Sequence, residues 1–185
     1  MNKIEDILGL LNDGFKTHYY KDITTYKVCV IVEKEDEEGT ILKIPSIYRG
    51  RGNYDTLQDD TKGLIIYHRI IGEIDNEEDT DNGFGRNSLT TETYPIRSVF
   101  YGQQPSIEND NCEDINYLLA REFKKLFKRR FDLDDIVRAT VGNINYDRTV
   151  ITEEEGIKTV PESVLFTIDS EIKIITTENC VELTC

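Results

Sequence analysis

No apolar run in the sequence approaches the roughly 18 residues that a membrane-spanning helix needs, so we expect no transmembrane segment and no membrane partner. The sequence also lacks a CxxC pair, because its four cysteines (Cys29, Cys112, Cys180 and Cys185) are scattered. Zinc sites usually pair their ligands about two to four residues apart. We therefore expect reduced thiols and no metal site, and a Cys180–Cys185 bridge would need an oxidising setting.

Cations are scarce: the sequence has 22 Lys and Arg residues against 36 Asp and Glu residues, which gives a net charge of −14. A protein that grips nucleic-acid phosphates over a broad surface needs a cation for each contact, and an acidic surface repels DNA instead. Hydrophobic residues make up only 38% of the chain, which predicts a modest core with protruding loops. The N-terminal MNKIEDILGLL carries acids and no small-residue cleavage site, so we expect no signal peptide and a cytosolic protein.

The clearest pattern is a helix over residues 112–130. Its apolar residues recur on one half of the helix, and its basic residues lie largely on the other half. Acids precede it and cations end it, as the helix dipole favours. This pattern predicts a helix with one face packed on a sheet. A second, shorter amphipathic helix is expected over residues 2–15, with Gly14 as its stop.

Strands are expected where β-branched and apolar residues cluster or alternate. These segments are 26–32, 40–48, 64–74, 93–102, 134–146 and 164–175. Extended loops are expected at 33–39, 49–63 and 75–92, and an acidic hairpin-like excursion at 147–163. The tail, residues 176–185, is expected either to add a short strand or to be flexible. The sequence thus predicts a single α+β domain over 1–185, with a largely antiparallel β-sheet and two helices packed on one face. Segment 64–74 is apolar on both faces, which predicts cover on both sides from helix, loop or a neighbouring subunit.

One constellation could carry chemistry. Glu171 and Lys173 share one strand face, as in the ExK half of a metal-dependent nuclease site, with Asp147 as the matching upstream acid. The competing interpretation is a solvated charge pair, since Asp147 is expected in a loop. No Ser/His/Asp or Cys/His set can be assembled by spacing, and we expect no catalytic residues, no cofactor and no enzyme activity.

Two polar residues fall at apolar positions. Glu122 points into the apolar arc of the 112–130 helix, so its carboxylate must be paired or neutral. It marks either a functional site, an edge position reached by Arg121 or Lys125, or a subunit contact. His68 lies in the strand that is apolar on both faces and is interpreted as a hydrogen-bonded core histidine.

Charged residues cluster in three places. One is the basic patch at the end of the 112–130 helix: Lys124, Lys125, Lys128, Arg129 and Arg130. This patch is either solvated or a contact with an acidic neighbour, which could be another copy of the chain. With Glu122 and two loop arginines it forms the candidate oligomer interface: Glu122, Lys124, Lys125, Lys128, Arg129, Arg130, Arg49 and Arg51. The acids of two expected loops are candidates for contact with neighbouring rings or with a lumen: Glu35, Asp36, Glu37, Glu38, Asp75, Glu77, Glu78, Asp79 and Asp81.

The order of elements is short helix, β-hairpin, strand, long loop, strand, helix and two closing strands. With TYPIRSVFYG leading into INYLLAREFKKLF and the acidic loops, it resembles the tail-terminator and head–tail joining proteins of tailed bacteriophages over roughly residues 2–175. The resemblance implies a structural subunit of a homo-oligomeric ring, six-fold or a multiple, between portal and tail tube. Such a protein is assembled in the host cytoplasm, contacts other tail and connector proteins in the virion, and surrounds a transient, non-specific passage for DNA.

Two other functions stay open at this stage. A soluble acidic binding module could imitate DNA and occupy a cationic partner. A metal-dependent nuclease would use Glu171 and Lys173.

Overall fold

The computed structural model describes residues 3–18, 23–57, 63–79, 87–102, 114–127, 136–157 and 163–179. This part of the chain forms an α+β fold with three helices and nine strands. In chain order they are α1 (Lys3–His18), β1 (Thr24–Val28), β2 (Val30–Glu35), β3 (Ile41–Gly50), β4 (Asn53–Thr56), β5 (Leu64–Ile70), β6 (Asp75–Asp79), β7 (Asn87–Gly102), α2 (Ile115–Phe127), β8 (Ile136–Asn145), α3 (Arg148–Glu155) and β9 (Val164–Asn179).

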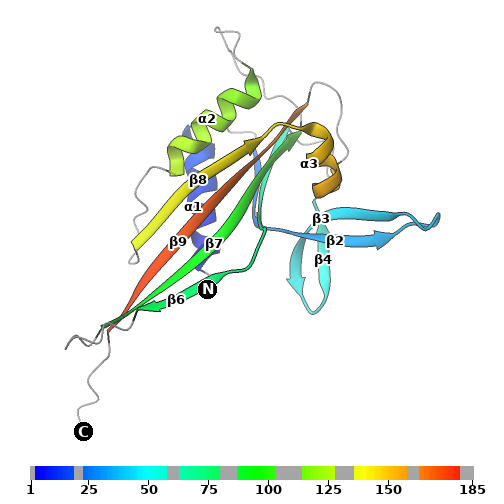
Figure 1. The fold of residues 1–185 in the computed structure, drawn as a ribbon. Helices are drawn as coiled ribbons and strands as arrows, with labels where there is room; N and C mark the ends of the chain where they lie inside the picture. Colours follow the sequence, from blue (N-terminus) through cyan, green and yellow to red (C-terminus); the bar gives the residue numbers. More distant parts are fainter. Residues whose placement is uncertain are drawn as a thin grey trace.

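The main sheet has the order β1-β5-β7-β9-β8, and β6 joins it by pairing with β7 beyond the end of β5. All its pairs are antiparallel except β1–β5, which is parallel. The 16-residue strands β7 and β9 run the length of the sheet (Figure 1) and pair in register from Asn87↔Asn179 to Gly102↔Val164. The prediction of a largely antiparallel sheet is confirmed.

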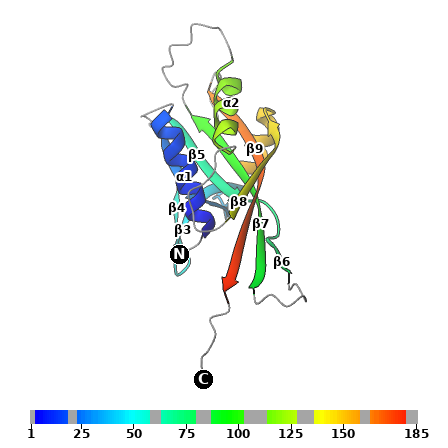
Figure 2. The same ribbon diagram turned by 90° about the vertical axis from the view of Figure 1, so that its left-hand side faces the viewer.

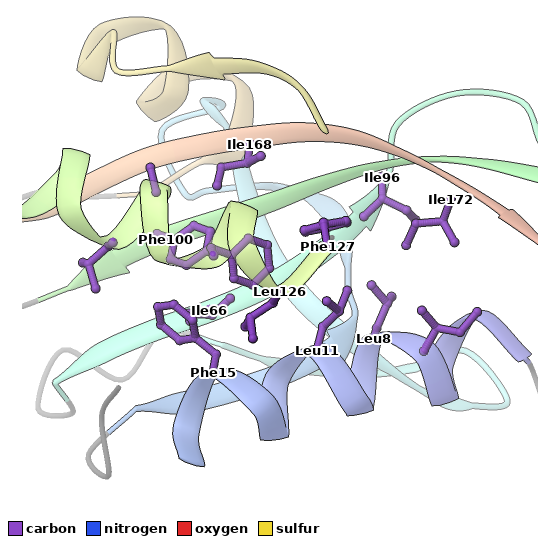
Figure 3. Packing of buried hydrophobic residues seen from close by; sticks show 14 of the residues in the cluster. Leu8, Leu11, Phe15, Ile66, Ile96, Phe100, Leu126, Phe127, Ile168 and Ile172 are labelled. Atoms are coloured by element: carbon purple, nitrogen blue, oxygen red, sulfur yellow. The ribbon is translucent and has the colours of Figure 1, made fainter. Parts of the chain in front are cut away.

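One face of this sheet shares a hydrophobic core with α1 and α2 (Figures 2 and 3). The helical spacing of apolar residues in α1 and α2 supplies one half of this core, and alternate residues of the strands supply the other half. Phe100 of β7 lies at its centre: its ring stacks on Phe166 of β9 at a centroid distance of 4.4 Å and meets Phe123 of α2 edge-on at 4.9 Å. Phe15 of α1 closes the aromatic group against Phe100 at 6.0 Å.

The opposite face carries a second buried cluster, which contains Ile65 and Tyr67 of β5 and Ile151 of α3. Strand β5 is therefore covered on both sides, as expected, and its cover comes from the chain's own helices and its second sheet. Its apolar faces are therefore buried within the chain and do not require a neighbouring subunit. The small sheet β2-β3-β4 joins the body on this side and projects away from it (Figure 1).

Several expected boundaries were wrong. Segment 147–163 was expected to be an acidic excursion but contains α3. Asp147 caps α3 and Gly156 ends it in the left-handed conformation, with φ +66°. These two cap residues outweigh the β-branched interior of the helix. Helix α1 runs through Gly14 to His18, because its buried face continues to Phe15.

The three expected loops were also partly wrong. Residues 33–35 belong to β2, and residues 53–56 within the expected 49–63 loop form β4. In the expected 75–92 loop, Asp75–Asp79 forms β6 along the threonine-rich start of β7, and pairing overrides the low strand propensity of Asp and Asn. For the tail, the strand alternative holds over residues 176–179, which extend β9 and form no separate strand. The single strand expected at 26–32 is two strands, which enter different sheets on either side of Cys29.

Candidate functional site

Among the described residues, one element projects from the body (Figure 1): the arm, which we define as residues 30–56 with strands β2, β3 and β4. Residues directly opposite each other in an antiparallel pair share a face. The register therefore sorts the arm into two faces. One face contains six apolar side chains, Val30, Val32, Leu42, Ile44, Tyr48 and Tyr54, with Lys34, Ser46 and Thr56. We call it the apolar face of the arm.

Four of the six apolar side chains on this face are exposed to solvent, whereas Val32 and Ile44 are half-buried and Ser46 is buried. Val30, Leu42, Tyr48 and Tyr54 keep 39%, 38%, 55% and 47% of their surface exposed. Tyr48 and Tyr54 pack on each other with ring centroids 5.3 Å apart, so the two rings form one aromatic surface. The opposite face includes Ile41 and Lys43, and Lys43 Nζ donates to the Glu153 carbonyl of α3 at 3.2 Å. The arm therefore rests on α3 by one face and presents the other to solvent.

The tip of the arm is acidic and well ordered by its own hydrogen bonds. Asp36 Oδ1 accepts from the backbone N–H groups of Glu38 and Thr40, at 2.9 and 2.8 Å. Glu35, Glu37 and Glu38 are exposed around this turn. At the other turn of the arm, Arg49 forms an exposed ion pair with Asp55 at 2.6 Å, and the exposed Arg51 has φ 53°. The two arginines and the tip acids thus lie on one projecting element.

The basic residues that the structure describes on α2 are Arg121, Lys124 and Lys125. Glu122 lies among them and is 7% exposed, and it accepts from Lys125 Nζ at 2.7 and 2.9 Å and from Arg121 Nε at 3.2 Å. The interpretation of Glu122 as an edge residue reached by Arg121 or Lys125 is confirmed. Because its charge is balanced within the helix, Glu122 leaves the outer face of α2 basic.

Other residues of the expected interface and lumen take different positions. Asp75, Glu77 and Glu78 are exposed on β6, so these acids lie on a strand at the sheet edge and not in a loop. Asp79 ends the same strand. Lys128, Arg129, Arg130, Asp81, Cys112, Cys180 and Cys185 lie outside the described residues. Cys29 is a buried free thiol, and burial raises its pKa to about 12.

A buried charge network that sequence reasoning missed lies beneath α3. Glu155 is fully buried; it accepts from Tyr67 Oη at 2.9 Å and pairs with Arg69 Nη1 at 2.6 Å, and Arg97 Nη1 lies 3.6 Å away. Arg97 also holds Asp169 through two hydrogen bonds, of 2.7 and 3.1 Å, and contacts Glu154. The hydrogen bonds to Asp169 raise the pKa of Arg97, and burial beside the Glu155 charge raises the pKa of Tyr67. The network ties α3, and with it the base of the arm, to β5, β7 and β9.

His68 is a fully buried core histidine, as predicted. Its Nδ1 lies 2.8 Å from Ser98 Oγ and its Nε2 lies 2.9 Å from Asn12 Oδ1, and Asn12 Nδ2 donates to the Tyr26 carbonyl at 3.2 Å. Burial lowers the pKa of His68 to about 3. The group links α1, β1, β5 and β7. No solvent reaches the imidazole, so it functions as a structural hydrogen-bonding group.

Glu171 and Lys173 form an exposed pair, with 3.4 Å between Oε1 and Nζ. The third residue of the nuclease hypothesis, Asp147, is occupied as the N-cap of α3, where its Oδ1 accepts from the backbone N–H groups of Thr149 and Val150 at 3.0 and 3.3 Å. Among the described residues, no group of three or more His, Cys, Asp or Glu side chains is placed to hold a metal ion. The described helices include none long and apolar enough to cross a bilayer.

We expect Asp147→Ala to lower the free energy of unfolding by about 1 kcal/mol, because the first turn of α3 loses its capping acceptor. Urea denaturation followed by circular dichroism measures this change. The control is Glu171→Ala, which removes the exposed carboxylate of the nuclease hypothesis and should change the free energy of unfolding by less than about 0.5 kcal/mol. Equal effects of the two substitutions would contradict the capping role of Asp147.

In comparisons with known proteins, no family model matches the chain, and a search of curated proteins finds no match.

Proposed function

We propose that this protein is a structural ring subunit of a phage head–tail connector or tail terminator, and that its ring surrounds a passage for DNA. The single observation that carries the proposal is the arm. Four of the six apolar side chains on its apolar face, Val30, Leu42, Tyr48 and Tyr54, are exposed in the isolated chain. Contiguous exposed apolar patches on soluble proteins often mark interaction sites. A subunit of a permanent assembly presents such a surface because a neighbour covers it.

Two further features support the same function. The observed order shares the short helix, the β2–β3 hairpin, β5, β7, α2 and the last strands β8 and β9 with the order on which the resemblance to tail-terminator proteins rests. It departs from that order by adding β4, β6 and α3, and α3 separates β8 from β9. The net charge of −14 suits a conduit, because acidic walls repel phosphates and let DNA pass without trapping it. The acids at the arm tip and on β6 are the candidates for walls or for contacts with other rings.

The proposal predicts closed rings of the purified full-length chain at high concentration. Native mass spectrometry should show six copies of the 21.4 kDa chain, about 128 kDa, or a multiple of that mass. Negative-stain images of the same sample should show a central hole. A chain that stays monomeric in both measurements, alone and mixed with a portal ring, would contradict the proposal.

The alternative of an acidic binding module remains the second candidate, because the exposed acids of β6 and of the arm tip could face a cationic protein. In that case the chain should remain a monomer or dimer and bind a cationic nucleic-acid-binding protein in a complex that salt dissociates. The same native mass measurement separates the two functions.

A further inference from the structure

The apolar face of the arm points to a particular occupant. We propose that the arm of one copy docks on the outer face of α2 in a second copy, so that subunits join head to tail. This inference rests on the proposed ring and names the two surfaces that would form its contact. The donor surface is the apolar face of the arm together with its acidic tip.

The acceptor surface combines aromatic and basic side chains. Tyr117 is 57% exposed on α2, and Lys124 lies seven positions further on the same side of the helix. Tyr146, which follows β8, is 43% exposed and packs on Phe166 of the helix-side core at 6.0 Å. Burial, together with the charges of Asp114 and Tyr117, raises the pKa of Tyr146, and Asp114 directly precedes α2. Two tyrosines and the cations of α2 thus share one surface.

Charge complementarity selects this acceptor. The turn at the arm tip carries the carboxylates of Asp36, Glu37 and Glu38, whereas Glu33 and Glu35 lie on the opposite face of the arm and Lys34 lies on the apolar face. Helix α2 carries three cations and one carboxylate, Glu122, which is paired, and the exposed Asp114 directly precedes the helix. A second exposed apolar group, Ile71, Ile74 and Leu89, lies near β6. It is surrounded by acids of its own, including Glu73 and Glu77, and would repel the arm tip. The basic surface of α2 is therefore the better match.

The arm and the outer face of α2 cannot contact each other within one chain. Helix α2 packs on one face of the main sheet, whereas the arm joins the body at the other face, beside α3. Figure 1 shows the arm and α2 on opposite sides of the molecule. A donor and an acceptor on opposite sides of one subunit generate a heterologous contact, which closes into a ring when the rotation between neighbours is suitable.

The apolar part of the contact is tested with two neighbouring residues. Leu42 lies on the apolar face, and Ile41 lies on the other face of the same strand and is even more exposed, at 64%. We expect Leu42→Ser to weaken self-association of the full chain by about tenfold or more in sedimentation velocity, because a buried apolar contact is lost. Ile41→Ser should leave association within about threefold of the wild type. Equal effects of the two substitutions would overturn the proposed docking face.

The charged part is tested by reversal and rescue. Glu37→Lys with Glu38→Lys, or Lys124→Glu alone, should each weaken association by about tenfold, and combining them should restore it to within about threefold of the wild type. Lys125 is left in place because it pairs with Glu122. The matched control is Glu73→Lys with Glu77→Lys, which makes the same change of net charge away from the arm and should not be rescued by Lys124→Glu.

The outcomes separate this inference from the proposed function. Closed wild-type rings that the arm and α2 variants leave unchanged would overturn arm docking and leave the ring intact. Open dimers or filaments that respond to the variants and to rescue as expected would support arm docking and contradict the closed ring. A wild-type chain that does not self-associate, either alone or mixed with a portal ring, would overturn both.

Discussion

Replacing Glu155 by alanine should lower the free energy of unfolding by about 3–5 kcal/mol, because the substitution removes the carboxylate that balances the charge of its buried partners. Glu155 is fully buried and pairs with Arg69, whose side chain is only 21% exposed, and it accepts the hydrogen bond of the buried Tyr67 hydroxyl. Urea denaturation of the full chain, followed by circular dichroism, measures the loss.

Glu154→Ala is the matched control for this change. Glu154 is the adjacent residue of α3 and also contacts Arg97, but its side chain is 47% exposed. Exposed ion pairs contribute little, so we expect a loss within about 1 kcal/mol. A loss for Glu155→Ala as small as that of the control would contradict the role of Glu155 as the centre of the network. Glu155→Gln, which keeps a hydrogen-bond acceptor, should fall between the two.

Acidification should destabilise the fold through His68. The pKa of His68 is about 3 in the folded chain, below the ordinary value of 6.5, so the unfolded chain binds the proton more tightly. The contribution of His68 to stability is therefore fully present above about pH 6.5 and is lost as the pH falls toward 3. Between pH 7 and pH 4 this loss should amount to about 3 kcal/mol.

The carboxylates of the chain titrate over part of the same range, so the effect of His68 is isolated by comparison with His68→Gln. This substitution keeps a side chain that can bond Asn12 or Ser98 and removes the titration. The difference in stability between wild type and variant should shrink by about 3 kcal/mol from pH 7 to pH 4. As a second measurement, the imidazole NMR signal of His68 should show no titration near pH 6.5 while the protein is folded. A titration there would contradict the burial argument.

Local sequence patterns were sufficient to predict an element and its buried face where one face is apolar and the other polar. The core of α2 was read from its helical spacing, and β9 from its strict alternation around Phe166 and Ile168. His68 was recognised as a core residue because apolar residues surround it on its strand. In each case the side chains that need burial are neighbours on one element, so the signal lies within a short window of sequence.

Elements whose stability depends on distant partners were missed. Strand β6 is acidic and polar and exists because the threonine-rich part of β7 lies beside it. Helix α3 could have been found from its caps, since Asp147 and Gly156 stand on either side of its eight residues. The importance of Glu155 had no local signal, because its partners Tyr67, Arg69 and Arg97 lie 58 or more positions away in the chain.

In the arm, too, some features follow from the local sequence and others from contacts between distant residues. By itself the sequence determined an acidic hairpin with β-branched strands, an acidic protein poor in cations, and an amphipathic α2 with one basic face. Only the tertiary structure decided that β1 and β2 enter different sheets, that α3 supports one face of the arm and leaves the other exposed, and that the arm and α2 lie on opposite sides of the main sheet. The reason is physical: periodicity within an element states which face must be buried, but the choice of what buries it depends on contacts between residues far apart in the chain.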